Sequence, residues 1–144
     1  MRKLIVIAML ALGVMACTED NDVTPFNGLE PISSEALSGR TFTQVEHYIV
    51  DNGVETPIEG NIGRTVNFLM ENDGVNGTEI SQGGMLGTVD RPFRIVEFIS
   101  VMPRLDYNMS SNPNIGNTTS AYFEDGQLKL VTWSSVGAVY SVFE

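Results

Sequence analysis

The chain has 144 residues, of which 18 are acidic and 8 are basic, and its formal net charge is -10. Nucleic-acid binding needs clustered lysine and arginine, whereas the basic residues here are scattered, so this class of function is excluded. A chain of this length is close to the common size of one domain, and we expect a single hydrophobic core.

The first segment, residues 1–16, predicts a secretory signal peptide. Arg2 and Lys3 precede an uninterrupted apolar run from Leu4 to Leu12. A charged start followed by a short apolar run is typical of such signals. A membrane-spanning helix needs about 20 apolar residues, and this run is much shorter. We therefore expect the segment to be cleaved rather than retained as a membrane span.

The residues at the expected cleavage point carry a processing motif. The sequence Val14-Met15-Ala16-Cys17 resembles the lipobox of bacterial lipoproteins. Cys17 is the only cysteine, so an internal disulfide is excluded. The resemblance implies that Cys17 becomes the first residue of the mature protein and carries fatty acyl chains such as palmitate, which anchor it to a membrane. The alternative is an ordinary signal peptide followed by a free cysteine.

An acidic run, Thr18-Glu19-Asp20-Asn21-Asp22, directly follows the cysteine. It is similar to the export signal by which lipoproteins of the Bacteroidota reach the outer face of the outer membrane, and this implies a lipid-anchored, surface-exposed protein. The alternative is a solvated tether that its own charge keeps extended. We expect residues 17–36 to be this acidic tether, and residues 37–144 to form the folded domain.

Strand-forming residues dominate the chain after Gly39. Runs rich in Val, Ile, Thr, Phe and Tyr predict strands over Arg40 to Val50, Thr65 to Met70, Phe93 to Met102, Gln127 to Trp133 and Ala138 to Phe143. Before them, Ser33 to Gly39 has a serine N-cap and a glycine stop, which predict one helical turn that caps the sheet.

Glycine and asparagine, which favour tight turns, separate these runs. Turns are predicted at Asp51-Asn52-Gly53, Asn76-Gly77, Asp90-Arg91-Pro92 and Glu124-Asp125-Gly126, among others, with a long loop over Ser110 to Asn117. The absence of a long helical period excludes parallel α/β folds. We expect an all-β antiparallel meander, as an up-and-down barrel of about eight strands; the alternative is a β-sandwich.

The order of these features resembles a known family. A helical turn, then Leu37-Ser38-Gly39-Arg40-Thr41-Phe42, then hairpins and the segment Phe123 to Leu128, is similar to small lipocalin-like lipoproteins of the Bacteroidota. The lipocalin tryptophan is absent, because Thr41-Phe42 stands in its place. The resemblance implies an up-and-down barrel with room for an apolar ligand.

Residues for catalysis or metal binding are sparse. His47 is the only histidine, and no nucleophile motif accompanies it, so we expect a structural histidine. Zinc would need several His or Cys ligands. Oxygen ligands for calcium crowd one segment, at Glu71, Asn72, Asp73, Asn76 and Glu79, without the EF-hand spacing. We expect no enzymatic activity, no cofactor and no metal.

Four aromatic residues are the candidate ligand contacts: Tyr107, Tyr122, Trp133 and Tyr140. The alternative is that they pack in the core. We expect a surface-anchored, non-enzymatic binding module for a small apolar ligand or a glycan. The other candidate role is that of a protein-protein accessory or hydrolase-inhibitor lipoprotein of the cell envelope. Exposed apolar residues near Asn112 to Asn117 or at Met85-Leu86 would favour that second role.

Overall fold

The computed structural model of the chain describes residues 28–84, 87–99 and 101–144. The expected signal peptide, Cys17, the acidic run and Met85-Leu86 lie outside these ranges, so their roles stay predictions. Within the described ranges, no helix has the length and apolar character needed to cross a membrane.

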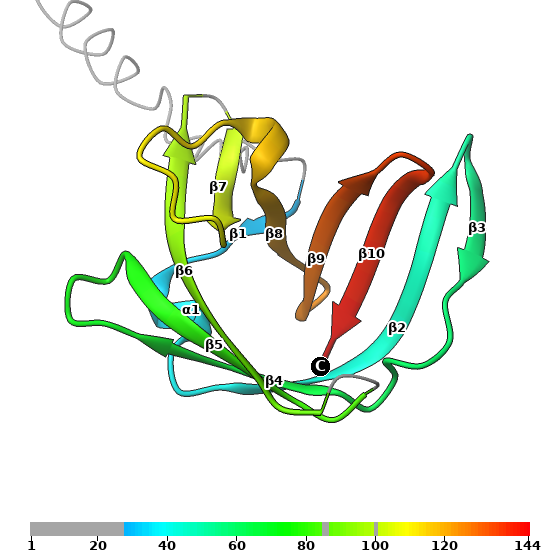
Figure 1. Cartoon of the computed structure of the whole chain (residues 1–144), viewed down its shortest axis with the longest axis horizontal. Coiled ribbons are helices and arrows are strands. Elements are labelled where there is room, and N and C mark those ends of the chain that lie inside the picture. Colours follow the sequence, from blue (N-terminus) through cyan, green and yellow to red (C-terminus); the bar gives the residue numbers. More distant parts are fainter. Residues whose placement is uncertain (1–27, 85–86, 100) are drawn as a thin grey trace, which may run out of the picture.

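Eight antiparallel strands form a closed up-and-down barrel (Figure 1). In their order around the barrel they are β2 (Thr41–Asp51), β4 (Thr65–Met70), β5 (Asn76–Gln82), β6 (Val89–Phe98), β7 (Val101–Asp106), β8 (Thr119–Glu124), β9 (Gln127–Ser134) and β10 (Gly137–Phe143). The barrel closes because β10 pairs with β2. The predicted all-β barrel is confirmed, and the chain does not form the alternative sandwich.

Two short strands extend this sheet. The second half of β2 pairs with β3 (Val54–Pro57), while its first residues pair with β4. Upstream of the barrel, β1 (Glu30–Pro31) pairs with β8, and the next residue, Ile32, is buried in the core. The folded region therefore extends upstream of Leu37, where the sequence placed the start of the domain.

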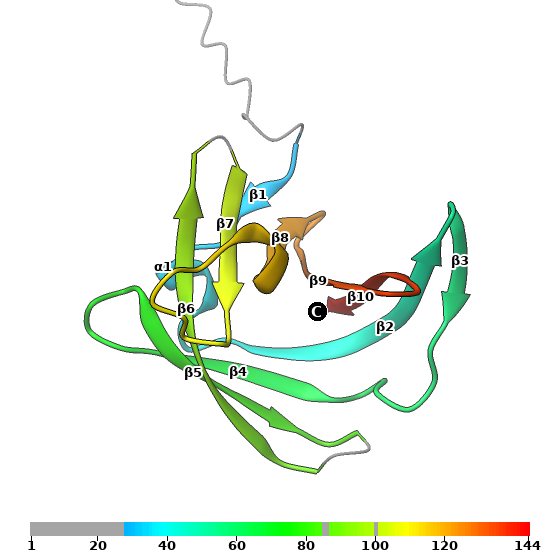
Figure 2. The same ribbon diagram turned by 45° about the horizontal axis from the view of Figure 1, so that its top comes forward.

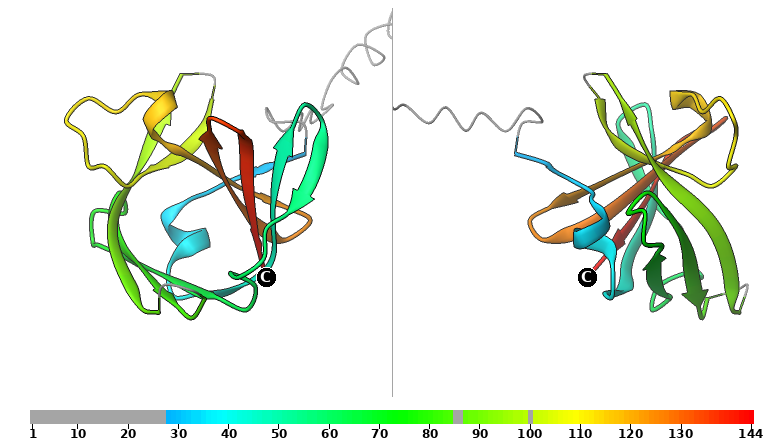
Figure 3. Two further views of the ribbon diagram at one scale, coloured as in Figure 1. Left: turned by 45° about the vertical axis from the view of Figure 1, so that its right-hand side comes forward. Right: turned by 90° about the vertical axis from the view of Figure 1, so that its left-hand side faces the viewer.

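The predicted helical turn is present as α1 (Ser34–Leu37) and lies within the ring of strands (left view of Figure 3). The Ala36 N–H donates to the Oγ of the N-cap Ser33 at 3.1 Å. Leu37 is fully buried in the core cluster. A single turn is unstable alone, so the burial of Leu37 holds it in place.

The connections between antiparallel strands alternate between the two ends of the barrel. The helix end carries α1, the β4–β5, β6–β7 and β8–β9 turns, and Glu144. The loop end carries the β2–β3 turn, residues 58–64, the β5–β6 connection, residues 107–118 with the 3-10 turn η1 (Ile115–Asn117), and the β9–β10 turn. Figure 2 shows η1 and the tips of the β2–β3 and β9–β10 hairpins from a second side.

The core lies on the inner face of the barrel, towards the helix end. Its buried members are mainly phenylalanine and leucine: Leu37, Phe42, Val66, Phe68, Phe93, Leu105, Ala121, Phe123, Leu128, Leu130 and Phe143, with Ile32. Phe68 packs edge-to-face on Phe42 and on Phe93, with centroid distances of 5.9 and 5.5 Å. Side chains therefore occupy this part of the interior.

Two predicted hairpin turns are confirmed by their backbone geometry. Asn52 and Gly53 have φ angles of 48° and 79°, and Asp125 and Gly126 have φ angles of 52° and 81°. A two-residue hairpin loop with both φ angles positive matches the twist of the flanking strands. Asparagine, aspartate and glycine accept this conformation at the least cost, which is why the sequence signal was reliable here.

The prediction of one strand over Phe93 to Met102 is wrong. The chain reverses after β6, and β7 begins at Val101 and returns antiparallel to β6. Ile99, at this reversal, is 97% exposed. No glycine, proline or asparagine marks the turn, so the run of β-branched and aromatic residues looked like a single strand.

Two other predicted turns are wrong because their residues lie within strands. Asn76-Gly77 begins β5, and Asp90-Arg91-Pro92 lies in β6. Gly77 is buried against the Phe93 ring: a Cβ atom built on it would lie 2.8 Å from Phe93 Cζ. The glycine is thus required by close packing rather than by a turn.

Candidate functional site

Three of the four predicted aromatic residues lie on one outer surface of the barrel. On β9, Trp133 and Val131 are two residues apart and therefore lie on the same side of the sheet. Val131 is the cross-strand partner of Tyr140 on β10. Lys129, on the same side of β9, faces Tyr122 on β8. The opposite face of these strands carries core residues such as Leu128 and Leu130. The three rings therefore point outward.

A fourth ring, which the sequence did not single out, completes this surface. Tyr48 on β2 is the direct cross-strand partner of Tyr140, and the two rings stack at 5.1 Å with an interplanar angle of 5°. We call Tyr48, Tyr122, Trp133 and Tyr140 the aromatic face. The sequence alone does not place Tyr48 beside Tyr140, because β2 and β10 lie far apart in the chain and pair only where the barrel closes.

Small apolar residues form the floor of the aromatic face. Val131, Ala138 and Val142 lie on the outer side of β9 and β10 and are nevertheless almost completely buried. An outward-facing residue is buried to this extent only when neighbouring side chains cover it. The neighbours of these three residues are the tyrosines of the aromatic face and Lys129. Trp133, in contrast, is 72% exposed. An exposed indole on a regular strand is unusual for a purely structural residue.

Polar groups surround the rings. The Lys129 ammonium forms an ion pair with Glu124, and this hydrogen bond raises the pKa of Lys129. Burial raises the pKa of the Tyr48 and Tyr122 phenols, which are therefore protonated at neutral pH and can donate hydrogen bonds. The aromatic face thus combines ring surfaces with hydroxyl, ammonium and carboxylate groups.

Two surface grooves adjoin the aromatic face, each lined by one of its tyrosines. Next to Tyr48 lies a groove of about 470 Å³, whose walls include Pro57, Ile58 and the carboxylates of Glu46, Glu55 and Glu59. A second groove, of about 310 Å³, has Tyr122, Met102 and Arg104 among its lining residues. The rings therefore lie between two concave surfaces.

Tyr107, the fourth predicted residue, lies apart from the aromatic face, inside the barrel. Its hydroxyl donates to Glu79, and the Arg91 guanidinium lies 4.4 Å from the centre of its ring. Burial, and then the negative charge of Glu79, raise the pKa of Tyr107 well above its ordinary value. The structure thus gives Tyr107 a place in an internal polar network.

The residues considered for catalysis or calcium have other partners. The His47 ring lies 3.4 Å from the Asn61 amide, and burial, followed by the charge of Arg64, lowers the pKa of His47. Asp73 accepts hydrogen bonds from the Val75 and Asn76 backbones at 2.9 Å, as in an Asx turn. Glu79 points into the barrel, on the inner face of β5, away from that turn.

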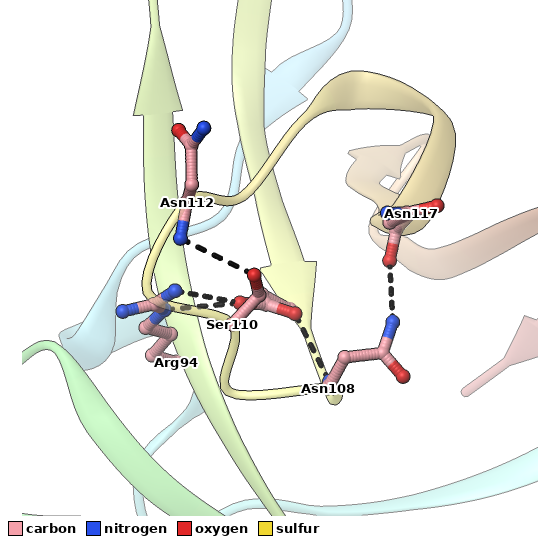
Figure 4. Close-up of polar contacts among 6 residues, drawn as sticks. Arg94, Asn108, Ser110, Asn112 and Asn117 are labelled. Carbon is pink, nitrogen blue, oxygen red and sulfur yellow. Dashed lines mark hydrogen bonds and ion pairs between the residues drawn. The ribbon is translucent and has the colours of Figure 1, made fainter.

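The long loop is held by a polar network at its base (Figure 4). Arg94 donates twice to the buried Asp106 carboxylate, at 3.0 and 2.9 Å, and the Asn108 backbone N–H donates to the same group at 3.0 Å. The Asn108 side chain then donates to the Asn117 carbonyl at 3.0 Å. This arrangement leaves the apolar side chains of Met109 and Ile115 exposed at the loop end.

No family model, curated protein or solved structure matches this chain.

Proposed function

We propose that the protein is a non-enzymatic binding module that binds a glycan through the aromatic face and is anchored by lipid on Cys17 to the outer membrane, displayed at the cell surface. The anchoring rests on the lipobox, Val14 to Cys17, and on the acidic run behind it. The resemblance to small lipocalin-like lipoproteins of the Bacteroidota supports the same location.

One observation carries the choice of ligand: four outward aromatic rings on four adjacent strands, with Trp133 exposed. One side of a sugar ring is lined by C–H groups, which stack on aromatic surfaces, while its hydroxyls need hydrogen-bonding partners at the rim. The aromatic face supplies the rings, and the adjoining groove supplies Glu46, Glu55 and Glu59. The alternative, a small apolar ligand inside the barrel, is less favoured because phenylalanine and leucine side chains occupy the inner face.

The aromatic face gives a direct test by substitution. We expect Trp133→Ala and Tyr140→Ala each to weaken glycan binding about tenfold or more, because rings of this kind dominate binding surfaces. The measurement is retention of the purified protein in native gels that contain a soluble β-glucan, xylan or mannan. Ile99→Ala, which removes an exposed side chain at the helix end, is the matched control and should migrate as wild type. Equal retention of all four proteins would contradict the proposal.

The lipid anchor is tested at Cys17. We expect Cys17→Ala to abolish incorporation of labelled palmitate and to move the protein from the membrane fraction to the soluble fraction, because the thiol is the acylation point. Thr18→Ala, one residue away, is the control and should stay acylated. A Cys17→Ala protein that is still labelled and membrane-bound would rule out the lipobox assignment.

The second candidate function, a protein-protein accessory role, is favoured by one feature of the loop end. Exposed large apolar side chains gather on the segments that form it: Val54, Ile62, Met109, Ile115, Trp133 and Val136. Exposed apolar residues at one end of a small barrel are typical of a protein contact. The double substitution Ile115→Ser with Val136→Ser separates the two functions. The variant should no longer bind a partner protein but should still be retained in gels that contain the glycan.

A further inference from the structure

We infer that the interior of the barrel at the loop end holds a site for a small oxyanion, such as phosphate or a carboxylate, between Arg64 and Arg91. This site is distinct from the aromatic face, because Arg64 and Arg91 line the inner surface whereas the four rings point outward. Three observations support the inference: the two arginine charges, the unpaired Nε of Arg64, and the cavity that both side chains line.

The carboxylate of Glu79 is fully engaged. The side chain of Glu79 is completely buried, and its Oε1 accepts from Arg91 Nη2 at 2.8 Å and from Ser81 Oγ at 2.6 Å. Its Oε2 accepts from the Tyr107 hydroxyl. Burial alone would raise the pKa of Glu79, but the charge of Arg91 and these hydrogen bonds outweigh burial and lower the pKa. Glu79 therefore neutralises one guanidinium.

The second guanidinium, that of Arg64, has no such partner. Among the described residues, Arg64 takes part in no ion pair, and its Nε is buried without a hydrogen-bond partner. Its guanidinium lies 5.5 Å from the centre of the Phe143 ring. Arg64 as a whole is half-buried, but leaving its Nε donor buried and unpaired is costly, and a bound anion that accepts from this atom would remove that cost.

A cavity lies next to these groups. It measures about 120 Å³, and its lining includes Asn61, Arg64, Ser81, Val89 and Arg91. Such a volume accommodates an anion of the size of phosphate or acetate. The lining offers donors, which is the chemistry that an oxyanion requires.

The local charge contrasts with that of the whole protein. The chain has a formal net charge of -10, yet this cavity is lined by two arginines, of which Arg91 is paired with Glu79. Burial and the charge of Arg64 lower the pKa of the nearby His47, so its ring adds no charge at neutral pH. A net positive pocket within an acidic protein selects small anions that enter the barrel.

Thermal unfolding in the presence of sodium phosphate, and separately of sodium acetate, tests the site at constant ionic strength set with sodium chloride. A ligand at ten times its Kd should raise the Tm of wild type by about 6 °C. Arg64→Gln should lose this rise, Arg64→Lys should keep part of it, and Arg40→Gln, an exposed arginine, should keep all of it. A response to phosphate alone or to acetate alone identifies the anion class.

Two results would overturn the inference: no rise of the Tm with either salt in wild type, or an equal rise in wild type and Arg64→Gln. Should Arg64→Gln unfold, the ¹⁵N resonance of the Arg64 side chain in wild type gives the second measurement. It should shift saturably with the anion, and an unshifted Arg64 resonance at saturating salt excludes the site. Since Trp133 faces outward, this test is independent of glycan binding.

Discussion

Glu79→Gln is expected to destabilise the protein by about 1 to 3 kcal/mol, because a fully buried carboxylate loses its ion pair with Arg91, whose side chain is 44% exposed and stays partly solvated. The substitution keeps the shape of the side chain but leaves Arg91 without its ion-pair partner, close to the Arg64 guanidinium that lines the same cavity. It also places an amide where Ser81 and Tyr107 donate. Urea unfolding followed by circular dichroism measures the loss.

The control for this substitution is Glu97→Gln, which removes an exposed carboxylate from β6 and should change stability by less than about 0.5 kcal/mol. The double change Glu79→Gln with Arg91→Gln should recover part of the lost stability, because it removes one of the two unpaired charges. A Glu79→Gln protein as stable as the control would mean that the internal network contributes nothing to folding.

The same carboxylate gives a pH dependence. The pKa of Glu79 is lowered in the folded state, so Glu79 stabilises the fold above its unfolded pKa of about 4.3. This contribution is lost as the pH falls through the lower, folded-state pKa. Wild type should therefore lose stability below about pH 4 more steeply than Glu79→Gln, and parallel acid profiles would contradict the assigned ion pair.

Gly77→Ala is the second substitution with a large expected effect, a loss of about 1 to 3 kcal/mol by overpacking. A Cβ at residue 77 would lie 2.7 Å from the Leu69 carbonyl oxygen and 2.8 Å from Phe93 Cζ. The ring has little space to move, because it also packs on Phe68. Urea midpoints of the variant and wild type give the difference.

Gly116→Ala is the matched control, since Gly116 lies in the exposed turn η1 and its added Cβ would meet only the Asn114 side chain, at 3.3 Å. It should leave the urea midpoint almost unchanged. Combining Gly77→Ala with Phe93→Leu should cost less than the sum of the two single changes, because the smaller side chain at residue 93 relieves the contact with Phe93 Cζ. A Gly77→Ala protein with the stability of wild type would show that β5 and β6 are packed less closely than the structure has them.

Strands and turns that carry a local signal were predicted from the sequence. Asn52-Gly53 and Asp125-Gly126 predicted their turns because these residue types accept the positive φ angles that the structure has there. The strand predicted over Thr65 to Met70 is β4, with the same bounds. The reversal at Ile99 was missed because its residues favour strands. The strand propensity of single residues does not predict where a strand ends when pairing with a neighbouring strand decides it.

β5 shows why the internal network was not predictable. Its inward side carries Gly77, Glu79 and Ser81, while Ile80 lies on the other side, so the usual pattern of apolar residues inward is reversed. No pattern in the local sequence predicts that Arg64 and Arg91 lie close to Glu79 inside the barrel. On the aromatic face, Tyr122, Trp133 and Tyr140 were predicted, but Tyr48 joins them only through the closure of β10 on β2.

The central claim, glycan binding at the aromatic face, is tested most directly by the fluorescence of Trp133, the only tryptophan in the chain. Because Trp133 is 72% exposed, a bound sugar should shield the indole from water. Titrating the purified protein with β-glucan, xylan or mannan hexasaccharides should give a saturable blue shift of the emission, and Tyr140→Ala should weaken it. A hexasaccharide that binds by calorimetry and leaves the Trp133 emission unchanged would contradict the proposal.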